Sequence, residues 1–218
     1  MSEAIRVVHY INQFFAGIGG EEKADTPPQR REGAIGPGRA FQQAFGDQAR
    51  IVATIVCGDT YFSEQPDQAA DDLIGLVTGD WPQALIAGPA FDSGRYGMAC
   101  GKVCVAAQER LGIPSVTGLA PENPGAEVYA AYTYVVPTGN TATTMREAVP
   151  PMARLALKLA RGEAIGRPGE EGYLPRGQRR NVFVAETAAQ RAVRMILKKV
   201  RGEPYETELR VPTGMYDR

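Results

Sequence analysis

Two segments of the sequence place reactive side chains directly after strand-like runs. The first reads "GIGGEE" and ends in the adjacent carboxylates Glu21 and Glu22, which suit an amine or ammonium ligand. The second brings Cys57, Gly58 and Asp59 together, and a cysteine at a strand end stands where a nucleophile or a redox thiol would stand. The pattern therefore predicts a ligand site, with Cys57, Asp59 and Glu22 as its candidate catalytic groups.

Each of these residues also has a purely structural interpretation. Glu21 and Glu22 are favourable charges for the first turn of a short helix. Cys57 could be a buried strand-end cysteine, with Asp59 capping the turn that follows. The only histidine, His9, lies in the middle of an apolar run and is interpreted as a core or interface residue.

The remaining cysteines and the glycines exclude two common kinds of site. Cys100 and Cys104 stand on one face of a predicted helix without further ligands nearby, so they are interpreted as core residues and no metal site is predicted. The dinucleotide fingerprint G-x-G-x-x-G fails because Glu22 occupies its third glycine position. Carboxylates there would also repel a pyrophosphate, which disfavours an independent dinucleotide-binding enzyme.

The elements that must position these residues alternate along the chain. Near-continuous apolar runs predict buried parallel strands at 5–11, 50–56, 84–89, 113–119 and 132–138. Between and after them, helical patterns cover about 36–45, 68–79, 95–112, 124–131 and 142–161. This order predicts a doubly wound α/β fold, with a mostly parallel Rossmann-like sheet and helices on both of its faces.

The amino-acid composition changes after the last of these helices. Residues 1–162 are predicted to form the α/β domain, in which Pro150 and Pro151 should kink or split the last helix. Residues 163–218 read as an extended arm, a helix at about 186–201 and a tail. We predict that this part forms a subunit interface, although plain wrapping of the surface is an equal alternative.

In a doubly wound sheet, ligands bind in the loops at the carboxyl ends of the strands. The five loops that follow the predicted strands are all polar and rich in glycine, and they should form one rim and one cleft. Arg95 could clamp a carboxylate, and carboxylates could attract an ammonium group. The aromatic walls of such a cleft would be Tyr10, Phe14, Tyr61, Phe91 and Tyr96. The predicted substrate-binding residues are Asn12, Gly19, Gly20, Glu21, Phe91, Arg95, Tyr96, Glu122 and Asn123.

Composition narrows the class of protein further. The 218 residues carry 24 Lys and Arg against 25 Asp and Glu, so no basic field favours nucleic acid. No apolar run approaches the roughly 20 residues that span a bilayer, and no signal peptide is apparent at the start. Three cysteines, an odd number, fit a reducing compartment. We therefore expect a cytoplasmic protein with no membrane or nucleic-acid partner.

Several long segments carry a resemblance to a known family. They read "VVHYINQFFAGIGGEEKAD", "VCGDTYF", "IAGPAFDSGRYGMACG", "ENPGAEVY" and "EEGYLPRGQRRN". Together they resemble the amino-terminal half of selenoprotein B, the large subunit of component B of the glycine, sarcosine and betaine reductases. The resemblance covers essentially the whole chain. Family members are roughly twice as long, and their selenocysteine lies in the half that has no counterpart here.

The resemblance implies a function and a set of partners. It implies a subunit of a heteromeric reductase that cleaves a carbon–nitrogen or similar carbon–heteroatom bond with a selenocysteine or cysteine on a partner chain. That partner would match the carboxyl-terminal half of the family, and this chain would be inactive without it. A pyruvoyl-type subunit, a thiol or selenol carrier protein and a small amine-type substrate would complete the system. No cofactor is expected on this chain itself.

One alternative function remains open alongside the catalytic one. The chain could be a non-catalytic subunit that binds an amine-bearing ligand or stabilises the assembly of such a complex. The sequence does not distinguish among glycine, sarcosine, betaine and other substrates with a soft leaving group.

Overall fold

The computed structural model describes residues 4–177 and 185–206 of the chain. Part of the predicted arm, 178–184, and the predicted tail, 207–218, lie outside the described residues. Contacts along the chain divide it into two units, residues 1–178 and residues 179–218. Each unit is described by itself below.

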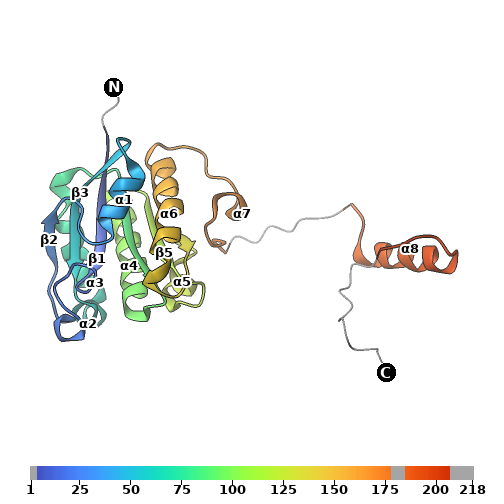
Figure 1. Ribbon diagram of the computed structural model, residues 1–218, viewed down its shortest axis with the longest axis horizontal. Coiled ribbons are helices and arrows are strands. Elements are labelled where there is room, and N and C mark those ends of the chain that lie inside the picture. Colours follow the sequence, from blue (N-terminus) through green and yellow to red (C-terminus); the bar gives the residue numbers. More distant parts are fainter. Residues whose placement is uncertain (1–3, 178–184, 207–218) are drawn as a thin grey trace. The chain divides into compact units, whose positions relative to one another are not determined.

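A six-stranded sheet forms the centre of the first unit (Figure 1). Its strand order is β2-β3-β1-β4-β5-β6, and every neighbouring pair is parallel except β2 with β3. The strands are β1 (Ile5–Asn12), β2 (Gln29–Glu32), β3 (Ala49–Cys57), β4 (Ala84–Phe91), β5 (Ser115–Leu119) and β6 (Tyr134–Pro137). The five predicted strands and the mostly parallel sheet are thus confirmed, whereas the antiparallel edge strand β2 was not predicted.

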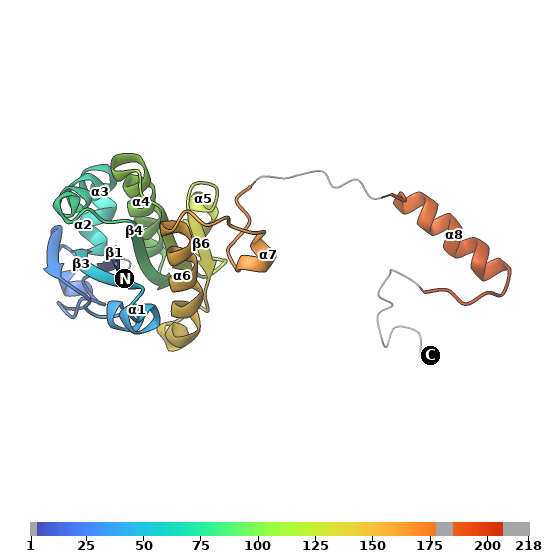
Figure 2. The ribbon, with the colours of Figure 1, turned by 90° about the horizontal axis from the view of Figure 1, so that it is seen from above.

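Helices cover both faces of this sheet, as the view from above shows most clearly (Figure 2). Helices α1 and α6 lie against one face, and α2, α3, α4 and α5 lie on the other. Their bounds are α1 (Gly38–Phe45), α2 (Asp59–Glu64), α3 (Pro66–Gly75), α4 (Gly94–Leu111), α5 (Pro124–Tyr129) and α6 (Met145–Ala160). A short helix, α7 (Pro168–Glu171), follows α6. The doubly wound α/β fold is confirmed.

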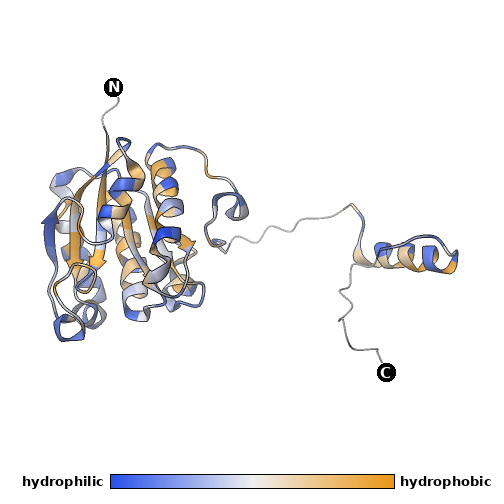
Figure 3. Ribbon diagram, viewed as in Figure 1, coloured by the Kyte–Doolittle hydropathy of each residue, from blue (hydrophilic) through white to orange (hydrophobic). Residues whose placement is uncertain are grey.

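Each face of the sheet has its own apolar core, because side chains along a buried strand alternate between the two faces. Val8, Tyr10 and Ile55 pack against α3 and α4, whereas Val7 and Ile51 belong to the core under α1 and α6. Colouring by hydropathy shows the inner strands as largely apolar, whereas the edge strand β2 is hydrophilic (Figure 3). The strands are therefore held rigidly from both sides, and so are the loops that leave their ends.

Local signals explain where the main helices begin and end. Helix α4 stops at Gly112, whose left-handed backbone (φ 66°) donates its N–H to Gln108. Helix α6 continues through Pro150 and Pro151, so of the predicted kink or split the split does not occur. Each proline removes only one backbone donor, and the flanking Val149 and Met152 are buried against the sheet and hold the helix there.

The described part of the second unit consists of one helix and its flanks. Helix α8 (Ala188–Val200) begins at a capping box in which Thr187 accepts from the N–H of Gln190. Its apolar side chains recur at helical spacing and are exposed; they are Val193, Ile196, Leu197 and Val200. None of the helices in residues 4–177 and 185–206 is both long and apolar enough to cross a bilayer.

Candidate functional site

A pocket of about 320 Å³ opens at the carboxyl ends of the strands. It lies where the chain order reverses, since β1 has β3 on one side and β4 on the other, and open α/β sheets bind ligands at such a point. Four loops contribute to it, those that follow β1, β3, β4 and β6. The lining residues are Asn12, Gln13, Phe14, Phe15, Gly20, Glu21, Asp59, Ala90, Phe91, Ser93, Tyr96, Asn140, Thr141 and Ala142.

Asp59 is the buried carboxylate of this pocket. It is the first residue of α2 and is only 7% exposed. Its Oδ2 accepts a hydrogen bond of 2.8 Å from the Nδ2 of Asn12, and its backbone N–H donates to the Oε1 of Gln13 at 3.0 Å. Burial raises the pKa of the Asp59 carboxyl, and the hydrogen bond from Asn12 opposes that rise.

The backbone around Asp59 is fixed by a close approach at Gly58. A Cβ on Gly58 would lie 2.2 Å from the backbone oxygen of Ala24, and the Gly58 N–H donates to Thr26 at 2.8 Å. Only glycine lets the segment after β1 pass this near to the end of β3. The close packing positions Asp59 opposite the end of β1.

Cys57 does not line the pocket, although it precedes Asp59 by only two residues. The side chain is fully buried in the core under α3 and α4. Burial and the nearby Asp59 carboxylate raise the pKa of the Cys57 thiol to about 12. A thiolate is the reactive form of cysteine, so this environment favours the structural alternative for Cys57 over the catalytic one.

The other two cysteines are also core residues. Cys100 and Cys104 are fully buried in α4, as expected from their spacing. Burial raises the pKa of the Cys104 thiol to about 12 and that of the Cys100 thiol well above its usual value. All three cysteines of the chain are thus buried, with thiol pKa values raised by that burial.

The two glutamates of the first loop have different partners. Glu21 lines the pocket, and its Oε1 accepts from Arg95 at 2.6 Å. Arg95 also donates to the Thr60 hydroxyl at 2.9 Å and does not line the pocket. Glu22 is exposed. Hydrogen bonds from its own backbone N–H and from the Gly20 N–H, the latter at 2.9 Å, lower the pKa of its carboxyl.

Asn123 shapes the third loop of the pocket from behind. Its Nδ2 donates to the backbone oxygens of Phe91 at 2.9 Å and of Ser93 at 3.1 Å, and its Oδ1 caps α5 by accepting from Gly125. Phe91 has a positive φ of 54°, which is strained for a residue with a Cβ. The hydrogen bonds of Asn123 therefore hold Phe91 in place, and Asn123 itself does not line the pocket.

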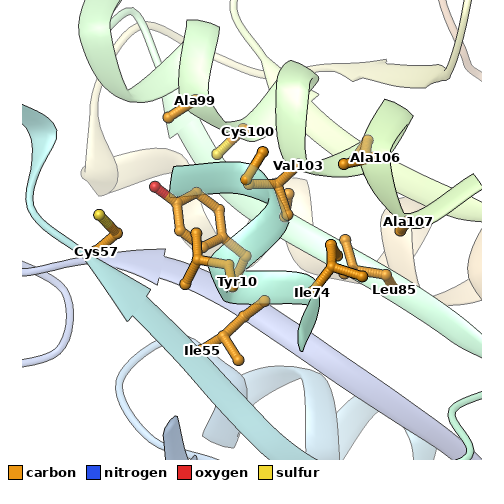
Figure 4. Close-up of a cluster of buried hydrophobic side chains, with 14 of the residues drawn as sticks. Tyr10, Ile55, Cys57, Ile74, Leu85, Ala99, Cys100, Val103, Ala106 and Ala107 are labelled. Carbon is orange, nitrogen blue, oxygen red and sulfur yellow. The ribbon is translucent and has the colours of Figure 1, made fainter. Parts of the chain in front are cut away.

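Aromatic rings form one wall of the pocket. The ring of Phe15 lies 6.4 Å from that of Phe91 and 5.8 Å from that of Tyr96, while Phe14 is 62% exposed. Tyr10 and Tyr61 do not line the pocket. Figure 4 shows Tyr10 within the buried cluster, with its hydroxyl directed between Cys57 and α4. In the part of the chain that the structure describes, the buried hydroxyls of Tyr10 and Tyr96 have no hydrogen-bond partner.

Sequence reasoning found about half of this site. Of the predicted site residues, the pocket brings together Asn12, Gly20, Glu21, Asp59, Phe91 and Tyr96. It does not include Gly19, Glu22, Cys57, Arg95, Glu122 or Asn123, of which Glu122 is exposed. Sequence reasoning missed Gln13, Phe15, Ser93, Asn140 and Thr141 as site residues, although all of them follow strand ends, which was the available signal. The described residues contain no cluster of three side chains that could hold a metal ion.

Comparison with known proteins gives a consistent result. A family model described as glycine/sarcosine/betaine reductase selenoprotein B (GRDB) matches residues 4–216. The sarcosine reductase complex component B subunit beta of Peptoclostridium acidaminophilum is 48% identical over 214 residues, which are 98% of this chain and 49% of that protein. The glycine reductase complex component B subunit gamma of Carboxydothermus hydrogenoformans is 50% identical over 95% of this chain and 48% of its own length.

A third relative is more distant, and no solved structure matches the chain. The betaine reductase complex component B subunit beta of Peptoclostridium acidaminophilum is 38% identical over 95% of this chain and 48% of its own length. The chain thus spans about half the length of the curated relatives it matches. Because the family model matches residues 4–216, the chain belongs to the glycine/sarcosine/betaine reductase selenoprotein B family.

Proposed function

We propose that this chain is a subunit of a reductase complex and that its pocket holds a small amine-type substrate for reductive cleavage of a carbon–nitrogen bond. The relatives are named as component B subunits of sarcosine, glycine and betaine reductase complexes. The pocket has matching chemistry, because a buried carboxylate beside aromatic rings can hold an amino group. We expect the chain to act on its substrate only within such a complex.

The attacking atom comes from a partner chain. The observation that carries this step is the burial of Cys57, Cys100 and Cys104, each with a thiol pKa raised by that burial. The pocket itself is open and holds no thiol among its lining residues. A selenol or thiol on a second polypeptide, equivalent to the other half of the family's length, would therefore enter from the open side.

The proposed displacement balances as follows. The selenolate or thiolate attacks the carbon that bears the amino group, a selenium–carbon or sulfur–carbon bond forms, and the carbon–nitrogen bond breaks. Its electron pair leaves with the nitrogen as a neutral amine. The carbon group stays on the attacking atom until a thiol or selenol carrier protein takes it over. A pyruvoyl-type subunit would be a further member of the complex.

The contribution of this chain is to bind and orient the substrate. Asp59 holds the nitrogen, Phe91 and Tyr96 pack against the carbon skeleton, and Ser93, Asn140 and Thr141 offer polar groups to the rest of the molecule. Positioning of this kind converts an encounter into a reaction between atoms already in place.

An assembly role is the second candidate function. Helix α8 exposes an apolar stripe that includes Val193, Ile196 and Leu197, and stripes of this kind pack against partner helices or grooves. In that case the chain would stabilise the complex and its pocket would contribute nothing to catalysis. The aligned polar groups of the pocket favour the substrate-binding function.

Purification of the protein from its native host tests the proposal. We expect at least one further chain to co-purify and the complex to release amine from glycine, N-methylglycine or N,N,N-trimethylglycine when a dithiol is supplied. A preparation that contains this chain alone, or a complex that releases no amine, would contradict the proposed function. Full activity in a complex that carries Asp59→Asn and Phe91→Ala would favour the assembly role.

A further inference from the structure

The buried carboxylate of the pocket has one oxygen that the protein does not use. Asp59 Oδ2 accepts from Asn12, but Oδ1 has no hydrogen-bond partner among residues 4–177 and 185–206. Arg95 could in principle donate to a carboxylate, but the bonds of its guanidinium go to Glu21 and Thr60. A buried carboxylate oxygen without a donor is costly, so the site is complete only when another group donates to it.

The backbone around Asp59 is held in place, which limits rearrangement as the remedy. The Oε1 of Gln13 accepts from the Asp59 N–H at 3.0 Å, and its Nε2 donates to the Gly20 oxygen at 3.4 Å. The close approach of Ala24 to Gly58 fixes the start of α2. Because Asp59 lines the pocket, water or a ligand in the pocket can approach its carboxylate. The acceptor therefore calls for a ligand with a hydrogen-bond donor.

The aromatic wall alone would not require a ligand with a hydrogen-bond donor. Phe15, Phe91 and Tyr96 could attract any cation by cation–π contact, including a quaternary ammonium whose methyl groups carry no donor. Such a ligand would cover Asp59 Oδ1 with methyl groups, remove water from it and leave it unpaired. A site that hydrogen-bonds its ligand discriminates strongly against an analogue that lacks the donor.

We propose that Asp59 makes this pocket selective for amines that carry an N–H, so that primary and secondary amino groups bind and a trimethylammonium group is rejected. The inference rests on the proposed function and deepens it, since it separates glycine-like and N-methylglycine-like substrates from their quaternary analogue. The N–H of the ligand donates to Oδ1 of Asp59. One charge-assisted hydrogen bond of this kind corresponds to a preference of about 10-fold to 100-fold.

Calorimetric titration of the 218-residue chain tests the selectivity directly. Glycine, N-methylglycine and N,N,N-trimethylglycine serve as the three probes. We expect the first two to bind at least about 10-fold more tightly than the third. Equal or tighter binding of N,N,N-trimethylglycine by the unaltered protein overturns the inference, and so does a failure of all three to bind.

Variants then assign the selectivity to one side chain. Asp59→Asn keeps the shape and removes the acceptor, because the new amide must use its oxygen to accept from Asn12 and so turns its NH₂ toward the ligand. We expect it to reduce the preference to less than about 3-fold. Asp92→Asn, at an exposed position of the neighbouring loop outside the pocket, is the matched control and should keep the preference. A folded Asp59→Asn variant with unchanged preference overturns the inference.

The selectivity and the proposed function can fail independently of each other. A reductase complex that releases trimethylamine as fast as it releases ammonia would leave the proposed function standing and remove the inference. Selective binding by a chain that forms no reductase complex would do the reverse.

Discussion

Acidification should destabilise this protein through one buried imidazole. His9 lies in β1 between β3 and β4 and is fully buried. Its Nε2 donates to the Gly88 backbone oxygen at 2.7 Å, which leaves Nδ1 without a proton and without a partner in the described part of the chain. The ring also packs edge-on against Phe41, with the centroids 5.2 Å apart. A second proton on this ring would place a charge in an apolar core.

The size and sign of the effect follow from the two pKa values. Burial lowers the pKa of His9 from 6.5 to about 4, while the hydrogen bond to Gly88 opposes that shift. Below pH 6.5 the unfolded chain binds a proton that the folded protein refuses, so stability falls as the pH falls. Linkage gives a loss of about 2 kcal/mol between pH 7 and pH 5, and of about 3 kcal/mol once the pH is below 4.

Urea unfolding at pH 7 and pH 5 measures the loss, with His9→Gln as the comparison. The glutamine amide can still donate to Gly88 but cannot be charged, so the carboxylates that titrate in both proteins cancel in the difference. The variant should lose about 2 kcal/mol less than the natural protein over this interval. Because His9 is the only histidine, its NMR titration can be read without assignment. Equal pH dependence of the two proteins, or a midpoint near 6.5 in the folded state, would refute the reasoning.

Three further outcomes are expected. Gly58→Ala should destabilise the fold by about 1–3 kcal/mol and weaken glycine binding, because the added Cβ would lie 2.2 Å from a backbone atom. Gly75→Ala is the control and should change neither property, because no atom lies within 4 Å of its Cβ. Equal melting temperatures for the two variants would contradict this prediction. Iodoacetamide at pH 8 should modify Cys57 only in urea, because a thiol with a pKa of about 12 forms almost no reactive thiolate at that pH. Rapid labelling of the folded protein, detected by mass spectrometry, would contradict this prediction. Glu21→Gln breaks only an exposed ion pair with Arg95, so chemical unfolding should report a loss below about 1 kcal/mol.

The sequence was sufficient for the sheet because buried parallel strands carry an unmistakable apolar pattern. It was not sufficient for β2, where Gln29–Glu32 are polar and follow two prolines. That strand forms because β3 offers an unpaired backbone edge, which is a tertiary interaction with no local signal. The same limit explains α6, where the buried neighbours of Pro150 override the local tendency to end the helix.

The site was predictable as a region and not residue by residue. Loops after parallel strands must meet at one edge, so the meeting of the Gly20, Asp59 and Phe91 loops follows from the topology alone. The direction of each side chain does not. Cys57 is the last residue of β3 and points into the core, while Asp59 begins a helix two residues later and faces the pocket.

Both borders of the sheet carry features that disfavour pairing with further strands. On one side β2 is short and carries Arg30, Arg31 and Glu32, and charged, short edges resist pairing with other chains. On the other side the Leu174 N–H donates to the Val135 oxygen of β6 at 2.7 Å and uses part of that edge. Both features disfavour edge-to-edge aggregation of this unit.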